Sequence, residues 1–217
     1  MNHKFLLATI AILMIATTSP AQVTDRDGNN YKTVKIGNQE WMAGNLNVSH
    51  FKNGDVIPEV KTLDAWKKAL AAHKPACCYY QNEQPNGKVH GRLYNWYAVN
   101  DPRGLAPKGW HVPTEADWNM LANSLGGKNI AGGKMKTTNG WAYNGNGKNE
   151  SEFAATPAGY RDDGGAFSYL GQYATWWASS ENNAATAWSA LLEHSGTAMN
   201  LEPGIKGEGR SVRCVRD

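Results

Sequence analysis

The sequence predicts an α+β domain that is loop-rich, with a few short helices early and antiparallel β-strands late. Three observations lead to this prediction. Apolar residues recur at helical spacing in two segments of the first half, and β-prone runs separated by turn residues fill the second half. Glycine is abundant, at 23 of 217 residues, and because it is a poor helix former the chain cannot be mostly helical.

The first 21 residues have the layout of a secretory signal peptide. Lys4 gives the positive start, Phe5–Ala16 is an apolar run that contains the single polar residue Thr9, and Ser19–Ala21 ends it with small residues. We expect cleavage after Ala21 and a single mature domain over residues 22–217 that is secreted, periplasmic or at the cell surface. An uncleaved anchor is the less favoured alternative, because the run is short for a bilayer span. No cysteine stands at the cleavage point, which disfavours a lipoprotein.

The charge pattern argues against nucleic acid as a partner. The formal net charge is +3, and lysines, arginines and acids are interspersed without a basic block. No later apolar run reaches the length of a membrane helix, so we expect no transmembrane segment in the mature chain.

Two β-prone runs near the start predict a hairpin. Tyr31–Ile36 and Gln39–Met42 flank the pair Gly37-Asn38, which favours a tight turn. The preceding Asp25–Asn30 is a cluster of turn residues. It does not fit an EF-hand calcium loop, because the twelfth position is Ile36 instead of glutamate.

Two helices are indicated by their spacing and their caps. Leu63, Trp66 and Leu70 predict an amphipathic helix over residues 63–73, with Thr62 as its N-cap. Thr114 and Asp117 form a potential capping box for a second helix.

This second helix contains an apolar run that begins at Trp118, and we expect it to stop at Gly126-Gly127. Capping also gives the acids of its first turn a structural role, and His111 is expected to brace the same turn. Between the two helices, Tyr79-Tyr80 is expected to begin a strand and Pro85–Gly87 to form a turn.

After Gly140 the chain is expected to be β-rich with long loops. The candidate strands are Ala158–Arg161, Thr175–Ala178, Ala187–Leu192, Thr197–Leu201 and Ser211–Val215.

Three cysteines leave two interpretations open. In an oxidising compartment Cys78, or less favourably Cys77, could pair with Cys214, whereas vicinal cysteines rarely bond to each other. The alternative is three reduced, buried thiols.

Several sequence blocks in fixed order resemble a known family. The blocks are Asn95–Thr114, Ala131–Lys136, Asn149–Ser151, Pro157–Arg161, Trp176-Trp177 and Ser211–Val215. Together they resemble the Fibrobacter succinogenes major paralogous domain family, a group of exported bacterial proteins. The resemblance spans about Val23 to Asp217. It implies a surface or secreted protein, and the family carries no established activity.

Two of these elements are also similar to a larger group of folds. The helix start Pro113–Trp118 and the terminal segment Arg213–Arg216 resemble the formylglycine-generating enzyme and C-type lectin superfold, which implies a C-type-lectin-like scaffold. Relatives in the family tend to carry tryptophan where this chain has Cys77. The resemblance therefore makes Cys78 the family-like cysteine and favours the Cys78–Cys214 disulfide.

Known catalytic motifs are missing from the sequence, so we expect a protein that is not an enzyme. There is no Gly-x-Ser-x-Gly and no His-Glu-x-x-His, and the histidines are scattered. Adjacent Cys77 and Cys78 do not suit a copper-dependent oxidase of the formylglycine-generating type. A polysaccharide hydrolase remains an alternative, because paired carboxylates cannot be located from sequence. The candidate acids are Asp162, Asp163, Glu181 and Glu193.

Nine tryptophans favour recognition of a ligand as the function. Trp41, Trp96, Trp110, Trp118 and Trp188 lie within apolar patterns and are expected to be buried. In the pair Trp176-Trp177, successive strand residues face opposite sides, so one ring could face the surface. The alternative is that long loops cover both rings.

We therefore predict a recognition module for a glycan or an extracellular or cell-surface protein. Its candidate binding residues are Trp176, Trp177, Glu181, Asn182 and Asn183. No cofactor is predicted, but calcium is possible at Asp162 and Asp163 together with Glu181 and Asn182, all of which could instead form turns. A purely structural or adhesive surface protein is a further alternative.

Overall fold

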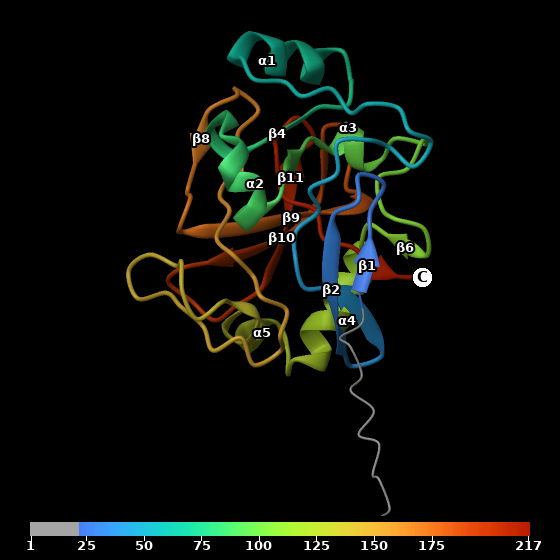
Figure 1. Cartoon of the computed structure of the whole chain (residues 1–217). Helices are drawn as coiled ribbons and strands as arrows, with labels where there is room; N and C mark the ends of the chain where they lie inside the picture. Colours follow the sequence, from blue (N-terminus) through green and yellow to red (C-terminus); the bar gives the residue numbers. More distant parts are fainter. Residues whose placement is uncertain (1–21) are drawn as a thin grey trace, which may run out of the picture.

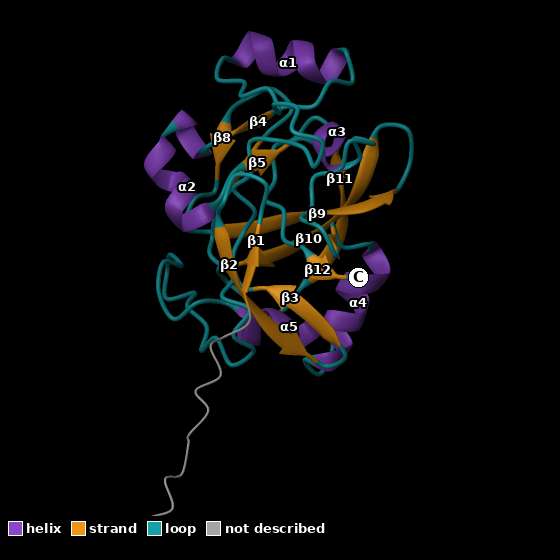
Figure 2. Ribbon diagram, turned by 45° about the vertical axis from the view of Figure 1, so that its right-hand side comes forward, coloured by secondary structure: helices purple, strands orange, loops and turns teal. Residues whose placement is uncertain are grey.

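The computed structural model describes residues 22–217, which fold mostly into antiparallel β-sheets with short helices between them (Figures 1 and 2). The larger sheet is five-stranded, in the order β1-β2-β3-β12-β6, and the second is three-stranded, in the order β11-β10-β9. Two short two-stranded ladders complete the β-structure. The bounds are β1 Gln22–Thr24, β2 Asn30–Ile36, β3 Gln39–Met42, β4 Cys77–Cys78, β5 Leu93–Tyr94, β6 Trp110–His111, β7 Tyr160–Arg161, β8 Phe167–Ser168, β9 Tyr173–Glu181, β10 Thr186–Glu193, β11 Asn200–Ile205 and β12 Val215–Arg216.

The helices are short and lie at the two ends of the molecule and along its side. Helix α1 forms one end and α4 with α5 the other, with the β9–β10 pair between them (Figures 1 and 2). None of the helices within residues 22–217 has the length and apolar character needed to cross a bilayer. The bounds are α1 Leu63–Ala71, the 3₁₀ turn η1 Tyr80–Asn82, α2 Gln84–His90, α3 Trp96–Val99, α4 Glu115–Ser124 and α5 Lys128–Met135.

Elements with local signals in the sequence form as predicted. Strands β2 and β3 pair as a hairpin. Thr62 caps α1 by accepting from the Ala65 amide, and Thr114 and Asp117 form the predicted capping box of α4. His111 braces this turn, because Nε2 lies 3.3 Å from Asp117 Oδ2 and Nδ1 lies 2.9 Å from Asp217 Oδ1.

The predicted order of elements and the C-type-lectin-like scaffold are wrong. Strands β1 to β3 precede every described helix, and α4 and α5 lie in the middle of the chain. The last strand, β12, pairs between β3 and β6. The arrangement is one of antiparallel sheets that use both ends of the chain, and a C-type lectin fold is not identified in it.

Two local predictions between residues 79 and 90 are also wrong. Tyr80 begins a 3₁₀ turn instead of a strand, and Pro85–Gly87 lies inside α2. Proline is tolerated there because it occupies the first turn of the helix, where its missing N–H has no intrahelical partner.

The β9–β10–β11 sheet is buried on both faces around Trp176 and Trp177. Trp177 packs into one apolar cluster with Tyr94 and Cys214, and Trp176 packs into another with Trp118 and Phe153. Trp41, Trp96, Trp110 and Trp118 are buried as predicted, and Trp188 is partly buried.

Arg213 is a fully buried cation that has no carboxylate partner within hydrogen-bond distance in the described chain. Its Nη2 donates to Asn45 Oδ1 at 2.7 Å, and its Nη1 donates to the Phe153 carbonyl. The guanidinium also lies 4.1 Å from the centroid of the Phe153 ring. Burial lowers the pKa of Arg213 to about 9. Dipoles and π-electrons thus replace the water that this charge loses.

Replacing Arg213 should be among the most destabilising single substitutions. We expect Arg213→Ala to lower the free energy of unfolding by about 3 to 5 kcal/mol, because it leaves buried acceptors unpaired and opens a cavity. Urea denaturation measures the loss. The matched control is Arg216→Ala, which removes a guanidinium whose side chain is 58% exposed and should cost about 1 kcal/mol or less. Equal losses in the two variants would contradict the role given to Arg213.

Candidate binding surface

The predicted tryptophan site is not at the surface. Trp176 and Trp177 are each 0% exposed. Trp176 Nε1 donates to Asn45 Oδ1 at 2.9 Å, and Trp177 Nε1 donates to the Tyr94 carbonyl at 2.8 Å. The two rings do point to opposite sides of β9, but an apolar cluster covers each side. Neither ring can stack on a ligand in this structure.

The polar residues of the same predicted site form the turn between β9 and β10. Glu181 accepts a hydrogen bond from Lys206 Nζ at 2.9 Å. The Asn182 amide donates to the Thr186 carbonyl at 3.0 Å, and Asn183 Oδ1 accepts from the amides of Ala185 and Thr186. These contacts close the hairpin, so the segment has a sufficient structural role.

Asp162 and Asp163, the predicted calcium ligands, lie in the tight turn between β7 and β8. Asp162 Oδ1 accepts from the Ala166 amide at 2.8 Å, and the Gly165 amide donates to the Asp162 carbonyl. Within residues 22–217, no three His, Cys, Asp or Glu side chains are grouped so that they could hold a metal ion.

Two of the four candidate acids for a hydrolase, Glu181 and Glu193, lie far apart. Glu181 ends β9, whereas Glu193 ends β10 and pairs with Tyr173 at the start of β9. Eight residues of strand therefore separate the two acids, roughly 25 Å along the sheet. Glycosidase carboxylates lie about 5 to 10 Å apart, so Glu181 and Glu193 cannot form such a pair.

The predicted Cys78–Cys214 disulfide is absent, and the three cysteines are free and buried. Successive residues of β4 face opposite sides, so Cys77 shares an apolar cluster with Cys214 while Cys78 enters another beside Trp66. Burial raises the pKa of Cys77 to about 12 and that of Cys78 to about 11. Both thiols therefore stay protonated at neutral pH and are poor nucleophiles.

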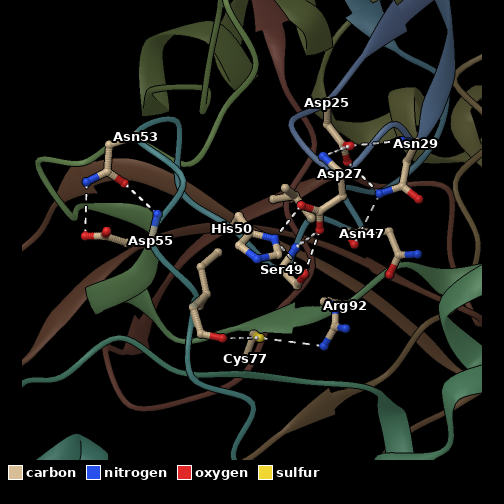
Figure 3. Close-up of polar contacts among 12 residues, drawn as sticks. Asp25, Asp27, Asn29, Asn47, Ser49, His50, Asn53, Asp55, Cys77 and Arg92 are labelled. Carbon is tan, nitrogen blue, oxygen red and sulfur yellow. Dashed lines mark hydrogen bonds and ion pairs between the residues drawn. The ribbon is translucent and has the colours of Figure 1, made fainter.

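A Ser-His-Asp contact at the N-terminal loop was not predicted (Figure 3). Asp27 Oδ2 accepts from Ser49 Oγ at 2.7 Å and from the Ser49 amide at 2.6 Å, and Asp27 Oδ1 lies 2.6 Å from His50 Nδ1. A catalytic triad needs the serine and the aspartate on different ring nitrogens, but here both contact Nδ1. The cluster ties the loop before β2 to residues 49–50.

The neighbouring Asp25 confirms the interpretation of this segment as a turn. Its carboxylate accepts hydrogen bonds from the amides of Asp27 and Asn29, from the Asn29 side chain and from Tyr31 Oη. Figure 3 labels Asp25, Asp27 and Asn29. Donors therefore occupy both oxygens, which leaves little room for a cation.

Sequence analysis missed a stack of three neighbouring tyrosines that is partly exposed. The rings of Tyr169 and Tyr173 lie 4.4 Å apart at 7°, and those of Tyr160 and Tyr169 lie 5.7 Å apart at 15°. The wider spacing means that Tyr160 and Tyr169 overlap only in part, so some ring face stays uncovered. Tyr169 is 43% exposed. We call Tyr160, Tyr169 and Tyr173 the tyrosine surface.

Three short elements bring these tyrosines together. Tyr160 lies in β7, Tyr169 directly follows β8, and Tyr173 begins β9. A turn in which the Tyr173 amide donates to the Tyr169 carbonyl sets the second pair side by side. Gly159 permits the close packing of β7 on this turn, because a Cβ there would lie 2.4 Å from the Ser168 carbonyl oxygen.

Acidic side chains surround the tyrosine surface, and one arginine supports it. Burial and then the charge of Glu208 raise the pKa of Tyr160, while burial and then Glu193 raise that of Tyr173. Arg210 donates to Glu208 Oε2 at 2.6 Å and lies 5.6 Å from the Tyr160 ring centroid. No hydrogen bond joins any of the three phenol hydroxyls to another described residue.

Comparison with protein families gives one match. The model of the Fibrobacter succinogenes major domain matches residues 34–216, which include the tyrosine surface and the buried core. Searches of curated proteins and of solved structures returned no match.

The free thiols lead to a direct chemical prediction. A thiol reagent should find no reactive cysteine in the native protein and three after unfolding in guanidinium without reductant. The control is the same unfolded protein treated first with a reductant, which should give the same count. A single reactive thiol before reduction would establish a disulfide and contradict the structure.

The Asp27 contacts predict a titration at acid pH. Burial opposes ionisation, but hydrogen bonds from Ser49 and His50 outweigh it and hold the pKa of Asp27 below 3.8. The stabilisation is therefore complete above the unfolded pKa and is lost as pH falls through the lower folded value. The NMR shift of the Ser49 amide should titrate with a midpoint below pH 3.8. In Asp27→Asn this titration should vanish; its persistence would contradict the assignment.

Proposed function

The chain belongs to the Fibrobacter succinogenes major domain family, and from that premise we propose that it is an exported, non-catalytic recognition module whose tyrosine surface binds a neutral glycan. Export is proposed from the signal-peptide layout of residues 1–21, which lie outside the described residues.

The single observation that carries this proposal is the exposed tyrosine stack. Aromatic rings that face solvent lose the stabilisation that burial would bring, whereas sugar rings place C–H groups on such faces. Tyr169 also keeps a left-handed backbone, with φ of 62°, which strains a tyrosine.

The polar groups around the stack suit sugar hydroxyls. Three phenol hydroxyls are available as donors and acceptors, and the carboxylates of Glu193, Glu202 and Glu208 lie close enough to act on the tyrosine pKa values. The same negative charges disfavour an anionic ligand, since only Arg210 opposes them and its guanidinium is bound to Glu208. A neutral glycan meets both conditions.

Binding should weaken when the stack is dismantled. We expect Tyr173→Ala and Tyr169→Asn each to reduce affinity for a neutral polysaccharide by roughly fivefold, because one stacked aromatic contact is worth about 1 kcal/mol. Asparagine is chosen at 169 because it tolerates a left-handed backbone. Affinity electrophoresis across a polysaccharide panel measures the change.

The matched control is Tyr97→Ala. Tyr97 is a half-buried tyrosine on α3 that stacks on His73 and is not part of the tyrosine surface. It should leave binding unchanged. Equal affinity of the Tyr173→Ala protein and the wild type for the neutral polysaccharide would contradict the proposal. If the wild type binds no polysaccharide of the panel, this would also contradict the proposal and would favour a protein partner.

A further inference from the structure

A groove next to Tyr143 combines exposed aromatic surface with positive charge. Its volume is about 480 Å³, and it lies between residues 144–148 and residues 194–197, with Gly133 and Lys136 among the lining residues. We propose that this basic groove is a second binding site, which takes the carboxylate or sulfate of an acidic sugar. The inference does not depend on the tyrosine surface.

The charge lining the groove is predominantly positive. Lys134, Lys136 and Lys148 contribute to its walls, and Glu150 is the acid among the lining residues. Lys148 makes no ion pair with any residue in 22–217, and Lys134 uses its ammonium on the Leu125 carbonyl at 2.9 Å, which leaves donors over. An oxyanion entering the groove therefore meets unneutralised cations.

Lys136 adds a fixed charge without serving as a ligand itself. Its ammonium donates to the carbonyls of Glu193, His194 and Gly196, the last at 2.6 Å, and lies 4.6 Å from the Trp141 ring centroid. These contacts occupy its donors. The buried positive charge remains beside the groove, and the charge of Glu193 offsets part of it.

Tyr143 directly precedes Asn144, a lining residue, in a tight turn that the Gly145 amide closes by donating to the Ala142 carbonyl at 2.9 Å. Its side chain is 79% exposed, and its backbone is left-handed, with φ of 52°. The ring meets His194 edge to face at 5.0 Å. Nδ1 of His194 is buried and has no hydrogen-bond partner among residues 22–217. Exposure and a left-handed backbone thus coincide at Tyr143, whose ring contacts His194 in the groove wall and is one on which a sugar can stack.

The decisive comparison is between an acidic sugar and its uncharged methyl ester. We expect a galacturonic acid oligosaccharide to bind, and its methyl ester to bind at least tenfold more weakly, in isothermal titration calorimetry at low salt. A sulfated galactose oligosaccharide tests the other source of the oxyanion, and binding by either acidic sugar supports the site. Equal binding of the acid and its ester would overturn the proposal. Inorganic sulfate alone should bind far more weakly than the oligosaccharides, and equal binding by sulfate would overturn the role of the sugar.

Three variants locate the site. Lys148→Glu and Tyr143→Gly should each weaken binding of the acidic sugar at least tenfold. Glycine tolerates the left-handed backbone at position 143, so the melting temperature of the Tyr143→Gly protein should not fall. Unfolding therefore cannot explain the loss of binding in this variant. Lys68→Gln, at an exposed lysine on α1, is the control and should bind as wild type.

Failure of this proposal is distinguishable from failure of the tyrosine surface. Tyr143→Gly should leave neutral-glycan binding intact, and Tyr173→Ala should leave acidic-sugar binding intact. Unchanged acidic-sugar affinity in both Lys148→Glu and Tyr143→Gly would reject the basic groove whatever the tyrosine surface binds.

Discussion

The positive charge of Arg213, held in the interior by dipoles, is the constraint on which the rest of the structure depends. Its guanidinium binds Asn45 and the carbonyl of Phe153, and Asn45 in turn accepts from Trp176 Nε1. A buried charge must be solvated by something, and here the groups that solvate it come from distant parts of the chain. Two other buried cations are solvated in the same way. Arg161 donates to the carbonyls of Val60, Lys61 and Gly165. Lys136 donates to carbonyls at the end of β10 and in the turn that follows it. Interior cations thus order loops that have little regular secondary structure of their own.

This arrangement also explains how two surfaces of opposite charge can lie near one strand end. Glu193 pairs with Tyr173 in the β9–β10 register, and its backbone carbonyl binds the ammonium of Lys136. The carboxylate of Glu193 therefore contributes to the acidic tyrosine surface while its main chain anchors a wall of the basic groove. A glycan with neutral and acidic units could contact both, but each surface has its own chemistry and its own test.

Local structure could be predicted from the sequence where the interactions that determine it lie within a few residues. Thr114 and Asp117 cap α4 through contacts three positions apart, and the Gly37-Asn38 turn sets the β2–β3 hairpin. Burial and the position of side chains could not be predicted where they depend on tertiary contacts. Strand alternation predicts that Trp176 and Trp177 point to opposite sides, but not that both sides are covered. The same alternation separates Cys78 from Cys214, and nothing local marks Tyr169 as exposed, because its position depends on the β7–β8 hairpin folding back onto β9. The binding surface that we propose therefore consists of other residues than the predicted ones, although it is again an aromatic surface.

The three buried thiols have a consequence for how this protein can be made. Since no covalent cross-link joins Cys77, Cys78 or Cys214, the chain needs neither an oxidant nor an isomerase to reach its native state. Its folding should therefore not depend on redox conditions, and the same domain should form in a reducing or an oxidising medium. Buried cations that bind backbone carbonyls, instead of disulfides, connect distant segments of this domain.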